Sequence, residues 1–402
     1  MSQLNEADGP AASQAPERPA WAAVLAMALG VFGLVTAEFL PASLLTSMAA
    51  DLDISEGAAG QAVTATAVIG MATSLLISAA TRRVDRRTVL LAFSVLLIFS
   101  NVLVAMAPDL PLLLLGRVLL GIALGGFWTM SAAVTMRLVP EAQVPQALSI
   151  TFSGVAAATI LAAPVGSFLG DIIGWRNVFL IAAVLGAVTL IVQLATLPRM
   201  APTGSTRLRT LADVLARPGV GLGMGAAMLV FTSHFAFFTY IRPFLETVTG
   251  VGTSTVSAVL LGFGIANFLG TLLAGRLLKR SLRVTLVAMP LSMGALGVGL
   301  VLLGSVPMAA ALMIAAWGLA FGAVPVAWST WLTRTVPDQA ESAGGLLVAA
   351  INLAIAMGAA AGGGMLDLSG VTGVFAGSSA ILLAAASMIL IGIRSRAAAA
   401  IA

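Results

Sequence analysis

The stretch GIALGGFWTMSAAVTMRLVPE at residues 121–141 occurs a second time, in altered form, as GLAFGAVPVAWSTWLTRTVPD at residues 318–338. The copies agree best at their ends, where GIALG matches GLAFG and RLVPE matches RTVPD, both at an offset of 197 residues (121 to 318). Two further pairs of motifs keep the same order along the chain. Ser74-Leu-Leu76 matches Thr271-Leu-Leu273, and Asp171-Ile-Ile-Gly174 matches Asp367-Leu-Ser-Gly370. Chance matches between Ala-, Leu- and Gly-rich helices are the alternative, but the matches include charged and proline residues. The sequence therefore predicts a duplicated chain.

The composition places most of this chain in lipid. Hydrophobic residues make up 59% of the 402 residues and charged residues only 9%, against about 25% in soluble domains. A soluble fold cannot hide so much apolar surface. A membrane helix needs about 20 mostly apolar residues, and twelve runs of this kind occur, at about 20–47, 58–80, 88–107, 111–136, 147–170, 177–197, 219–243, 254–275, 284–304, 308–333, 343–366 and 373–393. We expect an all-α membrane protein with twelve transmembrane helices.

The duplication divides these runs into two pseudo-symmetric bundles of six helices. We expect bundles at 20–197 and 218–393, joined by a cytoplasmic loop at 198–217, which is the longest polar stretch between runs. Residues 1–19 are polar and Pro-rich and lack the apolar core of a signal peptide, so they are predicted to be a disordered tail. Residues 394–402 are expected to form a second cytoplasmic tail.

Basic residues are unevenly distributed over the joints between the runs. One set of joints, with the two termini, holds 17 Lys and Arg residues, whereas the opposite set holds only Arg176 and Arg242. Cytoplasmic loops carry the excess of Lys and Arg, so both termini are predicted to be cytoplasmic. The basic pI near 10.8 reflects this rim, and no nucleic-acid partner is expected. Topology alone is the simplest explanation of the basic loops.

Three ionisable side chains lie well inside the apolar runs, away from their ends, namely Glu38, Arg117 and His234. Such groups are costly in a membrane and usually face a partner or a hydrated cavity. The repeat pairs Thr36-Ala-Glu38-Phe39 with Thr232-Ser-His234-Phe235 at an offset of 196 (38 to 234). Glu38 and Arg117 are predicted to lie at similar depth. Since apolar surroundings favour a neutral carboxyl and an arginine favours the ionised one, Glu38 is suited to proton coupling. A permanent structural ion pair is the alternative.

Proline and glycine mark candidate gating positions. Pro41 cannot donate to the carbonyl of Ala37, which predicts a bend and a free acceptor beside Glu38, although a simple packing kink remains open. Gly121 and Gly125 are predicted to let their helix approach a neighbour closely.

Candidate substrate-binding residues are the polar and aromatic side chains of the central runs. His234 could titrate or form hydrogen bonds, and a structural histidine is the usual outcome. Aromatic faces could stack on a planar ligand, with core or lipid packing as the alternative, while Asn352 could instead join helices by a hydrogen bond. The aromatic candidates are Phe127, Trp128, Trp317 and Trp328.

Enzyme chemistry finds little support in the sequence. With no cysteine in the chain, disulfides, thiolate metal sites and cysteine nucleophiles are excluded, and no metal site or cofactor is expected. The HExxH, Walker and Rossmann patterns are absent. An intramembrane hydrolase using His234 is the alternative from a different class. A channel is another, but a duplicated chain with one buried carboxylate favours alternating access.

Several motifs resemble those of one transporter family. They are Thr36-Ala-Glu38-Phe39, Arg117-x-x-x-Gly121-x-x-x-Gly125, Ala163-Pro164-x-Gly166, Gly174-Trp175-Arg176-x-x-Phe179 and Thr239-Tyr240-Ile241-Arg242-Pro243. Over its whole length the chain resembles the major facilitator superfamily, whose parallel repeats enclose a site between the halves, and more narrowly its twelve-span drug:proton antiporters. Stretches such as Glu38-Phe-Leu-Pro-Ala-Ser-Leu-Leu-Thr46 and Phe237-Phe-Thr-Tyr-Ile-Arg-Pro243 are similar to bacterial purine ribonucleoside efflux pumps.

The resemblance implies a proton-driven exporter of inosine, adenosine and guanosine in the bacterial cytoplasmic (inner) membrane, and we expect it to be a monomer. It implies proton coupling by Glu38 with Arg117, a helix bend at Pro164 and Gly166, and gating or structural roles for Tyr240 and Arg242. The family's basic loop is only partly kept, because Arg86 and Arg87 are present but Arg82 stands where an aspartate is usual. A sugar or multidrug exporter is the alternative within the family.

Overall fold

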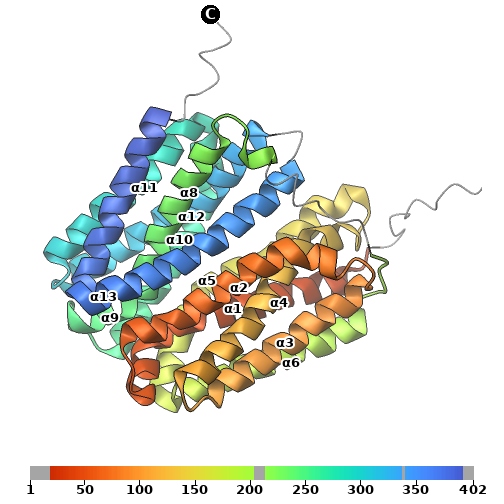
Figure 1. The fold of residues 1–402 in the computed structure, drawn as a ribbon, viewed down its shortest axis with the longest axis horizontal. Helices are drawn as coiled ribbons and strands as arrows, with labels where there is room; N and C mark the ends of the chain where they lie inside the picture. Colours follow the sequence, from red (N-terminus) through yellow and green to blue (C-terminus); the bar gives the residue numbers. More distant parts are fainter. Residues whose placement is uncertain (1–18, 203–212, 337–339, 393–402) are drawn as a thin grey trace, which may run out of the picture.

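The computed structural model describes residues 19–202, 213–336 and 340–392, and the described chain is helical with no strand. Figure 1 shows the helices of the two halves as two groups that lie side by side. The helices of the first half are α1 (Trp21–Leu52), α2 (Glu56–Ala80), α3 (Arg86–Ala105), α4 (Leu110–Met136), the short 3₁₀ helix η1 (Glu141–Gln143), α5 (Val144–Ile173) and α6 (Trp175–Thr196). Each of the first six predicted runs is thus a helix.

The second half repeats this series with two differences. Its helices are α8 (Val220–Thr239), α9 (Ile241–Thr247), α10 (Thr253–Arg280), α11 (Leu282–Leu303), α12 (Pro307–Thr335) and α13 (Ala340–Gly392). The run predicted at 219–243 breaks at Tyr240, whose φ of −109° and ψ of 16° leave the helical range. The short helix α9 then continues the chain, so one predicted helix is two.

Helix α13 contains two membrane spans. As one straight helix its 53 residues would be about 80 Å long, far more than the roughly 30 Å of a bilayer core. Gly370 interrupts it with φ 71° and ψ 176°, a backbone conformation that glycine adopts without steric cost. By length and composition, 11 described helices can cross a membrane, and the break at Gly370 makes the last of them two. The twelve predicted spans are therefore confirmed.

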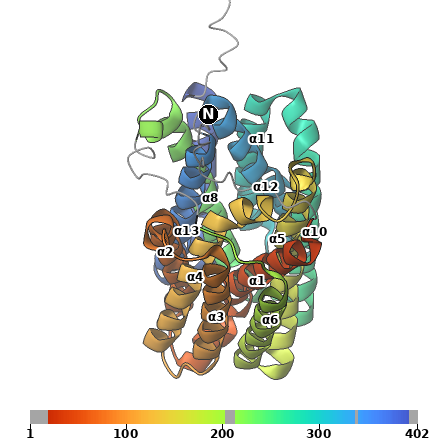
Figure 2. The same cartoon turned by 90° about the vertical axis from the view of Figure 1, so that its right-hand side faces the viewer.

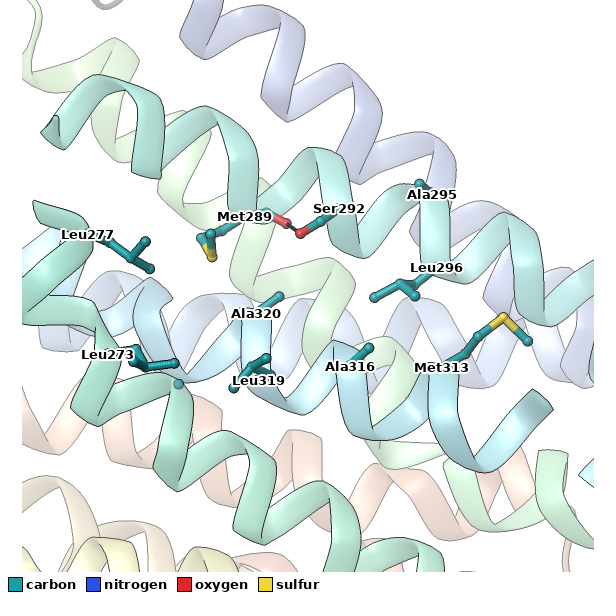
Figure 3. A pocket seen from close by; sticks show the side chains of 11 residues that line it. Leu273, Leu277, Met289, Ser292, Ala295, Leu296, Met313, Ala316, Leu319 and Ala320 are labelled. Carbon is teal, nitrogen blue, oxygen red and sulfur yellow. Dashed lines mark hydrogen bonds between the residues drawn. The ribbon is translucent and has the colours of Figure 1, made fainter. Parts of the chain in front are cut away.

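The two halves are built with the same helix contacts. In the first half α1 packs on α5, α2 on α4, and α3 on α6, and in the second half α8 packs on α13, α10 on α12, and α11 on α13. Between the halves, α2 lies along α13 and α5 lies along α10. In Figure 2 these interface helices lie at mid-height, α2 and α13 on the left and α5 and α10 on the right, with α3 and α6 below them and α11 above. The predicted class, two pseudo-symmetric six-helix bundles, is confirmed.

Glycines set the closest approaches within each half. A methyl group on Gly121 would lie 2.6 Å from the Thr66 carbonyl oxygen of α2, and one on Gly125 would overlap the carbonyl of Gly70. The repeat places Gly318 and Gly322 of α12 against the backbone of α10 in the same way. The glycine spacing of the repeated stretch thus fixes how closely α4 packs on α2 and α12 packs on α10.

Substituting Gly125 with alanine should lower stability by about 1–3 kcal/mol, because the new methyl group meets backbone that cannot rotate away. Thermal unfolding of the purified protein in detergent would measure the loss. The matched control is Gly275→Ala in α10, where a methyl group meets no atom within 4 Å and better helix propensity should be neutral or stabilising. Equal melting temperatures for the two variants would contradict the role of Gly125 in packing.

Candidate functional site

A small cavity lies between the two halves and is lined by both. Its walls are Glu38, Phe39 and Ala42 of α1, Val63 of α2, Phe235, Phe238 and Thr239 of α8, and Ile355 of α13. Its volume of about 10 Å³ leaves room for one water molecule at most. Glu38 and Thr239 are the polar side chains in an otherwise apolar lining. The carboxylate found in the sequence therefore lies on the surface along which the halves meet.

Arg117 holds the backbone around Glu38. The side chain is fully buried, and its guanidinium donates from Nη1 to the Ala37 carbonyl at 2.8 Å, from Nε to the Ala62 carbonyl at 3.1 Å and from Nη2 to the Glu38 carbonyl at 3.4 Å. Among the described residues, no ion pair joins Arg117 to the Glu38 carboxylate. Arg117 thus ties α4 to α1 and α2 through main-chain oxygens and leaves the carboxylate facing the cavity.

Pro41 explains why one of these oxygens is available. A proline has no N–H to donate to the carbonyl four residues earlier, so the Ala37 oxygen lacks its helical partner. Arg117 takes that place. The predicted free acceptor is therefore not free, because an arginine from α4 occupies it. Pro41 of α1 and the buried cation of Arg117 thus form one structural unit beside Glu38.

His234 lies behind the cavity wall, inside an aromatic cluster of the second half. Its side chain is 3% exposed, and its Nδ1 accepts a hydrogen bond of 3.2 Å from Trp317. The ring stacks on Phe321, and its neighbours Phe235 and Phe238 separate it from Glu38 in the lining. The structure thus gives His234 a protein partner and a place next to the lining residues rather than among them.

The other aromatic candidates lie outside the cavity lining. Phe127 packs against Gly30 of α1, and Trp128 stacks on Phe152 of α5. Trp317 stacks on Phe237 with ring centres 3.9 Å apart. Trp328 is buried and meets Trp331 edge to face. In the conformation described, these rings pack the interior of their own halves.

Asn352 is different, because it faces the other half. Its Nδ2 donates to the Val348 carbonyl of its own helix at 3.0 Å, while its buried Oδ1 has no hydrogen-bond partner. That oxygen lies against Gly70 of α2, because a Cβ atom added to Gly70 would be 3.0 Å from it. An acceptor without a partner at the interface between halves is available to a ligand or to water.

The structure adds four residues that reasoning from the sequence missed: Phe39, Phe235, Phe238 and Thr239 all line the cavity. Phe39 and Phe238 meet edge to face across the interface, with ring centres 5.4 Å apart. The Thr239 hydroxyl is buried without a partner. A signal for two of them was present, because the repeat aligns Phe39 with Phe235, each directly after the ionisable residue of its half.

The remaining candidates, from α5, α9 and the break between α8 and α9, lie between the cavity and one end of the molecule. We call it the Gly370 end, where α1 joins α2, α5 joins α6 and α13 turns at Gly370. Arg242 donates to the Ser43 carbonyl and pairs with Glu246, while Tyr240 donates to the Ala359 carbonyl at 2.8 Å. Pro164 is buried inside α5, and Gly166 lets α5 approach Ser43 of α1.

Arg86 and Arg87 lie at the opposite, basic end. Arg86 donates to the Thr81 hydroxyl at 2.9 Å and Arg87 to the Leu194 carbonyl at 2.7 Å. The carboxylate of Asp85, which precedes them, accepts from the backbone N–H of Arg87 and of Met200. These contacts connect the α2–α3 joint to the end of α6, all within the first half.

Comparison with known proteins decides the family. The family model described as Major Facilitator Superfamily matches residues 27–347. The chain belongs to the major facilitator superfamily. As a member of this superfamily it is a multi-span membrane transporter and not an enzyme.

Two curated relatives are similar to this chain in sequence over nearly its whole length. The purine ribonucleoside efflux pump NepI of Salmonella paratyphi B is 48% identical over 377 residues, which are 94% of this chain and 95% of that protein. The pump of the same name from Salmonella typhimurium gives the same identity and coverage.

Solved structures of the superfamily share the fold. A bacterial homologue of the human lysosomal transporter Spinster, in an inward-facing and occupied conformation, matches with a TM-score of 0.73 and 17% identity, covering 92% of this chain and 96% of its own. A D-xylose–proton symporter matches with a TM-score of 0.73 and 20% identity, covering 93% of this chain and 97% of its own. At these identities the likeness concerns the fold alone.

Proposed function

We propose that this transporter exports purine ribonucleosides, such as inosine, adenosine and guanosine, in exchange for protons. The observation that carries the proposal is the 48% identity to purine ribonucleoside efflux pumps over 94% of the chain. A neutral, planar nucleoside also suits a site between the halves that offers phenylalanine rings and a single carboxylate. An exporter of sugars or of several drugs is the second candidate. A site for a lipophilic cation, however, would be expected to hold more buried carboxylates than Glu38 alone.

In the proposed cycle, Glu38 carries the proton. Its carboxylate faces the seam between the halves, so relative movement of the halves changes its solvation and hence its protonation. Arg117 keeps the backbone of Ala37 and Glu38 fixed to α4, which gives the first half a rigid site for the exchange. A proton taken up from outside favours return to the inward-facing state, and the substrate leaves the cell.

The moving parts in this proposal are the two bundles, 20–197 and 218–393, which alternate about the interface of α2 with α13 and of α5 with α10. The protein works as a monomer in the bacterial cytoplasmic membrane, with the basic end and both termini in the cytoplasm. Thr239, Asn352 and the phenylalanines of the lining contact the substrate once the cavity widens, and His234 supports this wall through Phe235 and Phe238. The proton is the coupling ion, and no cofactor takes part.

Everted membrane vesicles test the function directly. With the interior made acidic, vesicles that contain the protein should accumulate labelled inosine well above control vesicles, and a protonophore should release it. Labelled sugars and a cationic dye are offered in parallel. Accumulation of a sugar or the dye without inosine would contradict the substrate assignment, and accumulation of inosine that survives the protonophore would contradict proton coupling.

A further inference from the structure

Hydrogen bonds between the two halves gather at the Gly370 end. Ser55, which caps α2, donates to Asp367 of α13, and Thr253 of α10 donates to Asp171 of α5. Arg242 of α9 adds a contact with the Ser43 carbonyl, between this end and the cavity. Each bond joins an atom of the first half to an atom of the second. Opening this end of the molecule must therefore break all of them.

Two of these contacts are copies of one another. Asp171 and Asp367 are equivalent in the repeat, and each is followed three residues later by a glycine with positive φ, Gly174 at 83° and Gly370 at 71°. The donors also lie in equivalent helices, since Ser55 caps the start of α2 and Thr253 is the first residue of α10. The Thr253–Asp171 distance is 3.2 Å and the Ser55–Asp367 distance is 3.4 Å. The same contact is thus made twice, in opposite directions across the interface.

Each aspartate also lies at the N-terminus of a helix of the other half. The first N–H groups of a helix have no partner within it and carry a partial positive charge, which attracts a carboxylate. At α2 the approach is direct, because a methyl group on Gly57 would lie 2.6 Å from Asp367 Oδ2. Glycine leaves the space in which the Asp367 carboxylate covers the first turn of α2.

From this geometry we propose that Asp171 and Asp367 are a pair of latches that hold the Gly370 end closed and so set the balance between the two states of the transporter. They are positioning residues that act on the conformation and do not contact the substrate. This inference rests on alternating access as proposed above. It does not depend on which substrate is carried.

The absence of cysteine from the chain makes a clean test possible. Ala59 of α2 is 1% exposed and packs in the cluster formed with the second half, so Ala59→Cys reports opening of the Gly370 end. In purified protein, the rate of maleimide labelling at this position should rise about two- to fivefold with Asp171→Asn or Asp367→Asn, and roughly tenfold with both. Melting temperatures identify any variant that has merely unfolded.

A matched control is Asp109→Asn, which removes a carboxylate that caps α4 within its own half through the Leu112 N–H. Labelling of Ala59→Cys should not change in this variant, and neither latch variant should alter labelling of the exposed control Met106→Cys. An unchanged rate at Ala59→Cys in the double variant, or an equal rise with Asp109→Asn, would overturn the proposal. Because labelling needs no substrate, failure to carry inosine would leave this result intact.

A covalent test gives a second measurement. Joining Ser55→Cys to Asp367→Cys with a short thiol-cleavable cross-linker should stop transport in everted vesicles, and reductant should restore it. Cross-linked protein that still transports at the full rate would show that this end does not need to open.

Discussion

Replacing Glu38 with glutamine is expected to abolish proton-driven accumulation while leaving the protein folded and able to exchange substrate. Glutamine fills nearly the same space at the seam between the halves but cannot gain or lose a proton at neutral pH. A gradient of one pH unit stores about 1.4 kcal/mol per proton, which supports about a tenfold substrate gradient for each proton exchanged. In vesicles with the Glu38→Gln variant, the ratio of internal to external substrate should fall to about one.

The measurement uses everted vesicles at several imposed pH differences. The accumulation ratio should rise with the gradient for the unmodified protein and stay flat for Glu38→Gln, whereas counterflow of labelled against unlabelled substrate continues. Glu141→Gln provides the matched control, since Glu141 is exposed in η1. If Glu38→Gln still concentrates substrate against its gradient, the carboxylate is not the coupling group.

Replacing Arg117 with methionine is expected to lower stability by about 1–3 kcal/mol and to reduce transport to background. Methionine fills the buried volume but leaves the Ala37 carbonyl without a partner, whereas the Ala62 carbonyl keeps the Thr66 hydroxyl as a donor. A buried polar group without a partner costs about 1–3 kcal/mol. Part of this loss is offset because an expensive buried charge is removed. Arg117→Lys should recover little, since one ammonium group cannot reach acceptors on two helices at once.

Pro41 provides the control for this interpretation. Pro41→Ala restores an N–H that can bond to the Ala37 carbonyl, so the loss caused by Arg117→Met should be smaller in the Pro41→Ala background. Thermal unfolding of the two single variants and the double variant yields the coupling, which we expect to be about 1 kcal/mol. Strictly additive effects would show that the two residues do not share that carbonyl.

The local features of the site could be found in the sequence, but its contacts could not. The register of the repeat paired Glu38 with His234 and aligned Phe39 with Phe235. It could not show that Phe235 lines the cavity while His234 turns to Trp317, because that depends on how α8 is rotated against α12. Similarly, depth along a helix brought Arg117 near Glu38, but only the crossing of α1, α2 and α4 directs its guanidinium to main-chain oxygens.

The twelve spans, the duplication and the ionisable residues Glu38, Arg117 and His234 within the spans could all be read from the sequence. The spans follow from the transfer of side chains and backbone into lipid, a quantity that adds up residue by residue along the chain, and the duplication follows from the repeated motifs. The tertiary structure alone decided that Arg117 binds the carbonyl freed by Pro41 and that Asp171 and Asp367 meet helix starts of the opposite half. Those partners lie tens to hundreds of residues away, and they are selected by close helix packing at glycines such as Gly57 and Gly125.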